Sequence, residues 1–295
     1  MHDLTLKPQG SERVELLDAA CVNPLWTYDW GSTDKAFVHP VRTPAGHVLT
    51  DFEPDDHTWH RGLWSTFKYL NGVNFWDERP GEDFGVQRPE APPTWDVTDG
   101  VATIRHDLVW IGPDGPEPYV HEQRTYRHIS LDEQAYAIDV ATVLRAGRDL
   151  SIDRQPYNGR WGGYGGITFR AHPGFLAHGV VRLSTGEVTD RPLGVRAAWA
   201  ELSAELSHQP GVMCGVAIFD HPRNPRHPTP WYGGAQDDKF PYLNAATVFH
   251  EPMTVRPEEP VSMRHRVVVH DGEWGAARIE QAYDAWLVEA GEPLG

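Results

Sequence analysis

The chain has 295 residues, enough to bury a sizeable core as one large domain or two ordinary ones. Its formal net charge of −16 argues against nucleic acid or an anionic membrane surface as partner, because both demand clustered Lys and Arg. No stretch has the length of a membrane span or the apolar core of a signal peptide, so we expect a soluble cytoplasmic protein and make no prediction of its oligomeric state.

Glycine and proline are frequent, with 28 and 25 copies, and they separate short apolar runs, which favours a β-rich fold over a helical bundle. The two cysteines, Cys21 and Cys214, lie far apart and carry no CxxC spacing, so we expect small-hydrophobe packing rather than a disulfide. The 12 tryptophans fit either of two roles, filling a sandwich core or walling a sugar-binding cleft.

The first third of the chain predicts short strands separated by turns that contain Asn-Pro, Gly-Ser and Pro-Ala-Gly. These strands are residues 12–18, 24–30, 36–42 and 47–52. Asn71-Gly72 predicts a two-residue hairpin turn. The segment 77–93 is charged and rich in Pro and Gly, so we expect a loop there.

The middle of the chain holds the clearest hairpin, in which Asp99-Gly100 joins residues 95–98 to residues 101–111. A second hairpin is expected from residues 119–129 and 134–144. Later strands are expected at residues 167–170, 179–184, 197–206, 212–219, 243–249 and 261–270. Only the segment of about 274–290 has apolar residues at helical spacing. The pattern predicts a single all-β domain over residues 1–295, with two packed antiparallel sheets and this C-terminal helix.

The segment from Glu53 to Trp64 is one of two dense polar stretches. His57 and His60 stand three residues apart and are followed by Arg61 and Trp64. Two imidazoles at this spacing on a loop can act as acid and base, can bind a substrate or can share a metal, and no HExxH pattern decides between these roles. A purely structural role is the remaining alternative.

The second polar stretch follows the apolar run 212–219, which predicts a buried strand. Four prolines between Asp220 and Tyr232 fix the backbone and exclude a helix or a central strand, so a rigid loop is expected. The candidate site residues on this loop are His221, Asn224, Arg226, His227 and Trp231. A solvated surface loop is the alternative.

A glycine-rich aromatic loop spans residues 154–166, and its five glycines allow the backbone to approach a ligand closely. Tyr164 and Trp161 are expected to wall a pocket beside it, and Trp76 to add an aromatic platform. Arg154 and Arg170, like Arg61, are candidates to grip a carboxylate or a diol, or else form internal ion pairs. On the strand 119–129, Glu122 is a candidate general acid or base.

These motifs carry a resemblance to a known family. The stretches that carry it are residues 37–46, 56–64, 71–76, 215–231, 244–246 and 264–272. On them the chain resembles an uncharacterised bacterial family tagged "methane oxygenase PmoA-like". The resemblance implies a large β-sandwich similar to the galactose-mutarotase (aldose-epimerase) super-sandwich, and gene neighbours in sugar catabolism. Relatives are expected to have His where this chain has Trp59, and His-Val-Arg where it has Tyr232-Gly233-Gly234.

The chemistry of these residues predicts a carbohydrate-active enzyme that cleaves or isomerises a glycoside or an oxidised 3-keto sugar. The catalytic candidates are His57, His60, Glu122 and His221. The alternatives are a non-catalytic sugar-binding protein and a metal-dependent lyase or hydrolase with His ligands. No cofactor is required by the sequence, and a divalent metal stays open.

We expect both His-rich segments, together with the glycine-rich loop, at one mouth of the sandwich. In that arrangement His57 or His60 lies within roughly 10 Å of His221 or His227, a span that one sugar ring can bridge.

Overall fold

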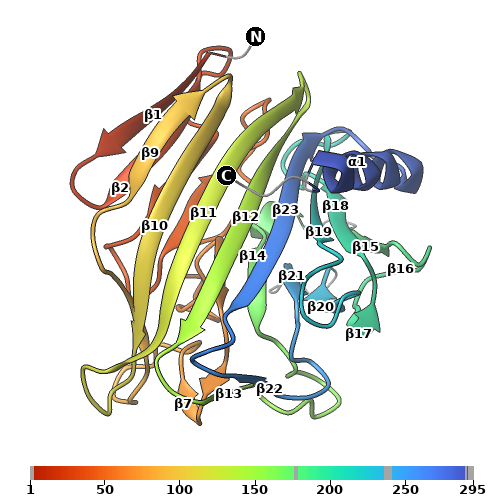
Figure 1. Ribbon diagram of the computed structural model, residues 1–295. Helices are drawn as coiled ribbons and strands as arrows, with labels where there is room; N and C mark the ends of the chain where they lie inside the picture. Colours follow the sequence, from red (N-terminus) through yellow and green to blue (C-terminus); the bar gives the residue numbers. More distant parts are fainter. Residues whose placement is uncertain (1–2, 176–178, 236–240, 290, 292–295) are drawn as a thin grey trace.

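Alternating apolar segments joined by Gly and Pro turns build two large antiparallel sheets (Figure 1). The computed structural model describes residues 3–175, 179–235, 241–289 and 291. One sheet has nine strands, in the order β1 (Leu4–Gln9), β2 (Arg13–Asp18), β3 (Trp26–Asp29), β4 (Phe37–Val41), β5 (Leu63–Thr66), β14 (Gly166–Arg170), β21 (Tyr242–Ala245), β20 (Pro230–Gly234) and β17 (Leu193–Arg196).

The other sheet has ten strands and contains the longest ones. Its order is β16 (Val188–Thr189), β15 (Val180–Leu183), β18 (Trp199–Glu205), β19 (Met213–Asp220), β23 (Val261–Asp271), β12 (Ala135–Ala146), β11 (Pro118–Asp132), β10 (Val101–Ile111) and β8 (Val86–Pro89), with β9 (Thr94–Thr98) on β10. A small third sheet has the order β22 (Met253–Val255), β13 (Leu150–Asp153), β6 (Tyr69–Leu70) and β7 (Val73–Asn74). A 3-10 turn, η1, covers Pro173–Phe175.

The main core lies between the two large sheets, and the ten-stranded sheet is buried on its other face too. Strand β19 shows this double burial, because Val216 and Ile218 enter the core between the sheets while Ala217 and Phe219 face the opposite way. The uninterrupted apolar run that predicts a buried strand is explained by this packing.

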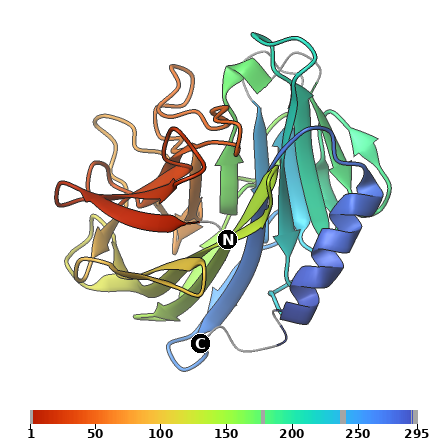
Figure 2. The same cartoon turned by 90° about the horizontal axis from the view of Figure 1, so that it is seen from above.

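The C-terminal helix α1 (Ala276–Glu289) covers that second face (Figure 2). Ile279, Tyr283 and Trp286 form its buried stripe at helical spacing. Among the described residues it is the one α-helix, so the prediction of an all-β, two-sheet sandwich with a C-terminal helix is confirmed.

Several local expectations were wrong. The predicted loop 77–93 contains strand β8, and the Pro-rich loop gives way to strand β20 at Pro230, which stands at the first position of the strand, where proline is tolerated. Residues 47–52 form isolated bridges at Val48, Thr50 and Phe52 instead of a strand. Within the described ranges, no helix is long and apolar enough to cross a membrane. That residues 1–295 form a single domain stays a prediction.

Candidate active site

The outer face of the nine-stranded sheet, opposite the main core, carries a cluster of aromatic side chains. Strand alternation separates the two faces, so Leu63 and Trp231 lie in the core while their neighbours Trp64 and Tyr232 lie in the outer cluster. The buried members of the cluster are Phe37, Trp64, Trp76, Tyr232, Tyr242, Ala246 and Phe249. Partly buried rings of Phe52, Trp59, Tyr157 and Tyr164 pack against them.

A cavity of about 580 Å³ opens over this aromatic cluster. Its volume is typical of small-molecule sites, which span roughly 300–1,000 Å³. The lining combines aromatic, cationic and anionic groups with two imidazoles. The lining residues are Asp56, His57, Trp59, His60, Trp76, Asp77, Arg79, Arg160, Trp161, Tyr164, Arg191, Tyr232 and Tyr242.

His57 is held by a carboxylate that is itself held by a guanidinium. Nδ1 of His57 lies 2.9 Å from Oδ2 of Asp56, and Nη2 of Arg170 donates to the same carboxylate at 3.0 and 3.3 Å. Because an ionised carboxylate only accepts hydrogen bonds, this contact places the proton of neutral His57 on Nδ1 and the lone pair on Nε2. Burial lowers the pKa of His57 below 6.5, with Asp56 opposing the shift, so the ring is a neutral base at neutral pH.

His60 lies behind His57, with ring centroids 4.7 Å apart and a stacked arrangement. The centroid of the His60 ring also lies 5.0 Å from that of Trp64 and 5.6 Å from that of Tyr242. The residue is 2% exposed, and burial lowers its pKa well below 6.5. We therefore assign His60 to positioning His57 as a neutral ring, and not to exchanging protons with solvent.

The glycine-rich loop borders the cavity, as predicted. It contributes Arg160, Trp161 and Tyr164, and the ring of Tyr164 lies 4.9 Å from that of Trp76. Gly163 has a φ of 77°, and a Cβ there would meet the ring of Phe249 at 2.3 Å. The sequence needs glycine here because the backbone passes directly against the aromatic cluster. Burial raises the pKa of the Tyr164 phenol far above 10, so the hydroxyl keeps its proton and can donate.

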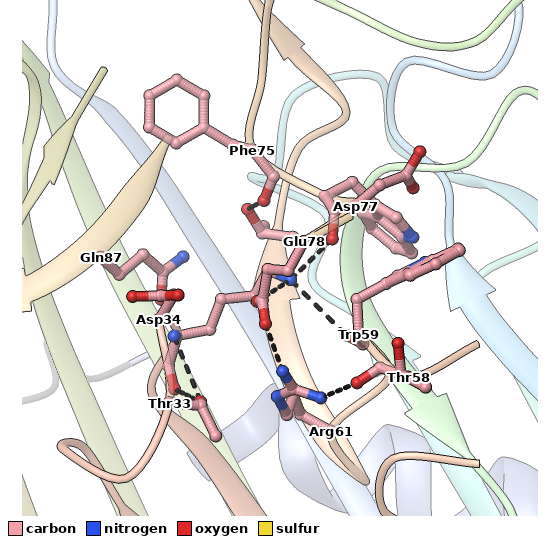
Figure 3. A network of polar contacts seen from close by, with 12 residues as sticks. Thr33, Asp34, Thr58, Trp59, Arg61, Phe75, Asp77, Glu78 and Gln87 are labelled. Carbon is pink, nitrogen blue, oxygen red and sulfur yellow. Dashed lines mark hydrogen bonds and ion pairs between the residues drawn. The ribbon is translucent and has the colours of Figure 1, made fainter. Parts of the chain in front are cut away.

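A buried polar network supports the cavity floor (Figure 3). Arg61 donates to Glu78 and to the carbonyl oxygen of Thr58, joining the His-containing loop to the segment after Trp76. Lys35, 1% exposed, lies 2.5 Å from Glu78 and donates to the Trp76 carbonyl oxygen at 2.6 Å. Burial lowers its pKa to about 8. Nη1 and Nη2 of Arg61 are thus engaged inside the protein, and its predicted role in binding substrate stays a prediction.

Five of the residues predicted to form the site line the cavity, namely His57, His60, Trp76, Trp161 and Tyr164. Trp64 contacts His60, Arg170 holds Asp56, and Arg61 belongs to the polar network. The remaining candidates are not among the lining residues.

The structure places Glu122, a predicted general acid or base, outside the cavity lining and in a buried ion pair. Glu122 is 1% exposed, accepts from Trp110 Nε1 at 2.8 Å and forms an ion pair with Arg124 at 2.7 Å. Arg124 also donates to the carbonyl oxygen of Ala36 at 3.2 Å, so the pair bridges the two large sheets. Two opposite charges two apart on one strand share a face, and that spacing is the signal for this internal ion pair.

Within the second His-rich segment, Tyr232 lines the cavity, whereas His221 and His227 are not among its lining residues. The shared mouth for these imidazoles and His57 or His60 therefore stays a prediction. Asp220, 1% exposed, accepts from Asn224 at 2.7 Å and contacts His227 at 2.8 Å. His221 packs its ring edge against Trp286 of α1, with centroids 5.4 Å apart. Through Asp220 and His221 the loop joins α1 to the ten-stranded sheet.

The other basic and aromatic candidates are structural as well. Arg226 donates to the carbonyl oxygens of Thr247, Glu251 and Pro252, and Arg154 donates to those of Phe249 and His250. Trp231 is fully buried in the main core and donates to the Ala197 carbonyl oxygen at 2.9 Å. The aromatic residue that this motif presents to the cavity is the next one, Tyr232.

Several lining residues were missed, and some of them had a signal. Asp56 stands beside His57, and an adjacent carboxylate is the usual partner that orients a reactive imidazole. Tyr232 follows from strand alternation once the direction of Trp231 is known. No sequence signal places Arg191 or Tyr242 at the cavity, because the pairing of strands that are distant in sequence brings them there.

Two groups of side chains are candidates to bind a metal ion. Within the described ranges, three potential ligand side chains come within 4.8 Å of one another at His47, Cys214 and Asp271. Burial, with Asp271, raises the pKa of the Cys214 thiol to about 12, so a metal would have to displace the thiol proton in order to bind there. His57 and His60 stack face to face, so their in-plane lone pairs do not converge on one point. We assign no metal role to either group.

A family model described as "Family of unknown function (DUF6807)" matches residues 21–284. The predicted resemblance to an uncharacterised family is thereby confirmed, whereas the PmoA-like tag is not shown. No curated protein matches the chain.

Solved structures of similar shape include two aldose epimerases and a lyase. A putative aldose 1-epimerase from Klebsiella pneumoniae has 8% identity and a TM-score of 0.48 over 100% of this chain and 90% of that chain. An aldose epimerase homologue from C. elegans has 8% identity and a TM-score of 0.35 over 93% and 100% of the two chains. A heparan sulfate lyase from Pedobacter heparinus has 10% identity and a TM-score of 0.36 over 93% and 36%. Similarities at this level carry no argument about chemistry.

Proposed function

We propose that this chain, which belongs to the family of unknown function DUF6807, is a carbohydrate-active enzyme that uses His57 as its base on a glycoside or a keto sugar. The observation that carries the proposal is a chain of hydrogen bonds at the wall of the aromatic cavity, in which Arg170 donates to Asp56 and Asp56 contacts His57. A carboxylate that fixes the tautomer of an imidazole is a recurring means of keeping a base ready for proton transfer.

The reaction that suits this arrangement is proton removal next to a carbonyl group. Nε2 of His57 takes the proton from the carbon beside the keto group, and the electron pair of that C–H bond forms an enolate. The imidazolium then returns the proton to carbon, which isomerises the sugar, or gives it to the departing oxygen as the adjacent C–O bond breaks. Tyr164, whose phenol stays protonated, can donate a hydrogen bond to the enolate oxygen.

The aromatic walls support a sugar as the ligand. Trp59 and Trp76 line the cavity beside Tyr164 and Tyr232, so ring faces surround the space above the imidazole. Aromatic faces pack against the C–H groups of a sugar, and the neighbouring Asp, Arg and Tyr groups can bind its hydroxyls.

The proposal is tested by incubating the protein with glycosides, 3-keto glycosides and free aldoses in D₂O. Nuclear magnetic resonance then reports cleavage, isomerisation or deuterium uptake at carbon. His57→Gln should lower the rate about 10²–10⁴-fold, because an amide cannot accept the proton. It should leave the Kd for the sugar within about tenfold, or 1.4 kcal/mol.

His227→Gln is the matched control, because His227 makes the same kind of aspartate contact outside the cavity. Its folded fraction should retain the wild-type rate. If the wild type binds these sugars and changes none of them, the protein is a sugar-binding protein and the enzymatic proposal fails. Equal losses in His57→Gln and His227→Gln would also contradict it.

A further inference from the structure

The entrance of the cavity concentrates positive charge in a chain whose net charge is −16. Three arginines line it, namely Arg79, Arg160 and Arg191. They come from three separate segments of the chain, so no single basic run produces this concentration. A basic cleft in an acidic protein selects ligands by charge, since field lines concentrate in the cleft.

The two acidic lining residues do not cancel this charge, because each is bound by a cation of its own. Asp56 contacts Arg170 Nη2 at 3.0 Å, and Asp77 contacts Lys68 Nζ at 2.5 Å. The Arg170 and Lys68 side chains are 1% and 4% exposed, so both cations act from behind the cavity wall. The three lining arginines outnumber the two lining carboxylates, and both carboxylates have cationic partners behind the wall.

Arg160 and Arg191 have no carboxylate partner among the residues that the structure describes. Arg191 donates to the carbonyl oxygen of Arg160, which ties the two residues together at the entrance. Arg79 rests on the ring of Trp59, 5.1 Å from its centroid, and lies 3.6 Å from Asp77. Guanidinium groups placed in this way can bind a carboxylate, phosphate or sulfate through two parallel hydrogen bonds.

The same entrance carries an exposed aromatic ring. Trp161, 45% exposed, is the one aromatic residue among the exposed large hydrophobic side chains of the described residues. It directly follows Arg160, so an aromatic face and a guanidinium stand side by side at the cavity edge. Such a pair suits a sugar ring that bears an anionic group.

We infer that the substrate is an acidic sugar, whose negatively charged substituent binds Arg160 and Arg191 at the entrance while its ring lies over His57. This inference rests on the proposed function, because it assigns a substrate class to the same cavity. Carboxylate, phosphate and sulfate share the chemistry that the arginines recognise, and the experiment separates them.

The experiment measures affinities by calorimetry for matched neutral and acidic probes. The pairs are methyl glucoside with methyl glucuronide, and glucose with glucose 6-phosphate and glucose 6-sulfate. At least one acidic probe should bind at least about tenfold more tightly than its neutral parent, and the preference should shrink as salt screens the charges. The acidic probe that binds best identifies the substituent.

Arg160→Gln/Arg191→Gln should abolish that preference, so that each acidic probe binds no more tightly than its neutral parent. The matched control is Arg105→Gln/Arg256→Gln, which removes two exposed arginines that pair with Asp96 and Glu259 away from the cavity. This control should keep the preference. The absence of any preference in the wild type, or its survival in Arg160→Gln/Arg191→Gln, would overturn the inference.

Failure of the acidic-sugar inference can be distinguished from failure of the proposed enzymatic function. His57→Gln should retain the preference for acidic probes, because His57 contributes to turnover and not to charge recognition. Tight binding of acidic sugars without turnover would contradict the enzymatic proposal alone. Turnover restricted to neutral sugars would contradict only the acidic-sugar inference.

Discussion

Asp56 with His57 and Asp220 with His227 are two aspartate–histidine pairs of nearly equal geometry, with Nδ1 to Oδ2 distances of 2.9 and 2.8 Å. Their surroundings differ. The side chains of Asp56 and His57 are 30% and 33% exposed at the cavity, whereas that of Asp220 is 1% exposed.

Asp220 is the centre of a buried hydrogen-bond network. Beside His227 it accepts from Asn224 at 2.7 Å and from the backbone N–H of Thr229 at 3.0 Å, and His265 lies 3.5 Å away. Burial raises the pKa of its carboxyl, but the hydrogen bonds from His227 and His265 outweigh burial and lower it. The proposed function thus assigns chemistry to one Asp–His pair and structure to the other, on the basis of solvent access and of the number of other donors to the aspartate.

The largest difference between the two segments is expected when Trp231, near His227, and Trp59, near His57, are each replaced by Ala. Trp231→Ala should destabilise the protein by about 3–5 kcal/mol, because it empties a fully buried site in the main core. Trp59→Ala, at the partly exposed cavity wall, should cost at least about 2 kcal/mol less. It should weaken sugar binding about tenfold. Chemical denaturation and calorimetry measure both, and equal destabilisation would show that the first segment is structural too.

The pH dependence of turnover provides the second, smaller contrast. A base works when it is unprotonated, so kcat/KM should fall as the pH drops through the pKa of His57, which burial places below 6.5. Asp56→Asn should move this midpoint to still lower pH, because it removes the carboxylate that raises the pKa. Asp220→Asn should leave the midpoint in place. A midpoint above 6.5, or one that follows Asp220, would assign the base to another residue.

Sequence reasoning identified the architecture, because its elements are encoded locally. The Asp99-Gly100 turn and the apolar run 212–219 specify their elements without reference to the rest of the chain. Which face of a strand meets the core depends on its neighbours, however. For that reason Trp231 was expected at the site in place of Tyr232, and the ion pair of Glu122 was missed.

The cavity itself could be predicted only in part. The glycine-rich loop was expected beside a ligand, and Trp161 and Tyr164 lie there. Arg191 and Tyr242 arrive through the pairing of β17, β20 and β21, which are distant in sequence from His57. The different burial of the two Asp–His pairs could not be read from the sequence, because it depends on which distant segments pack around each pair.

The most direct test of the account measures turnover and unfolding free energy for Asp56→Asn and Asp220→Asn side by side. Asp56→Asn should lower kcat/KM about 10²-fold. It should change the unfolding free energy by no more than about 1 kcal/mol, because its pair is partly exposed. Asp220→Asn should cost about 3 kcal/mol of stability, since it weakens a buried charge network. Its folded fraction should turn over substrate at the wild-type rate. Equal destabilisation by the two variants, or loss of turnover in folded Asp220→Asn, would contradict the division between a catalytic and a structural pair.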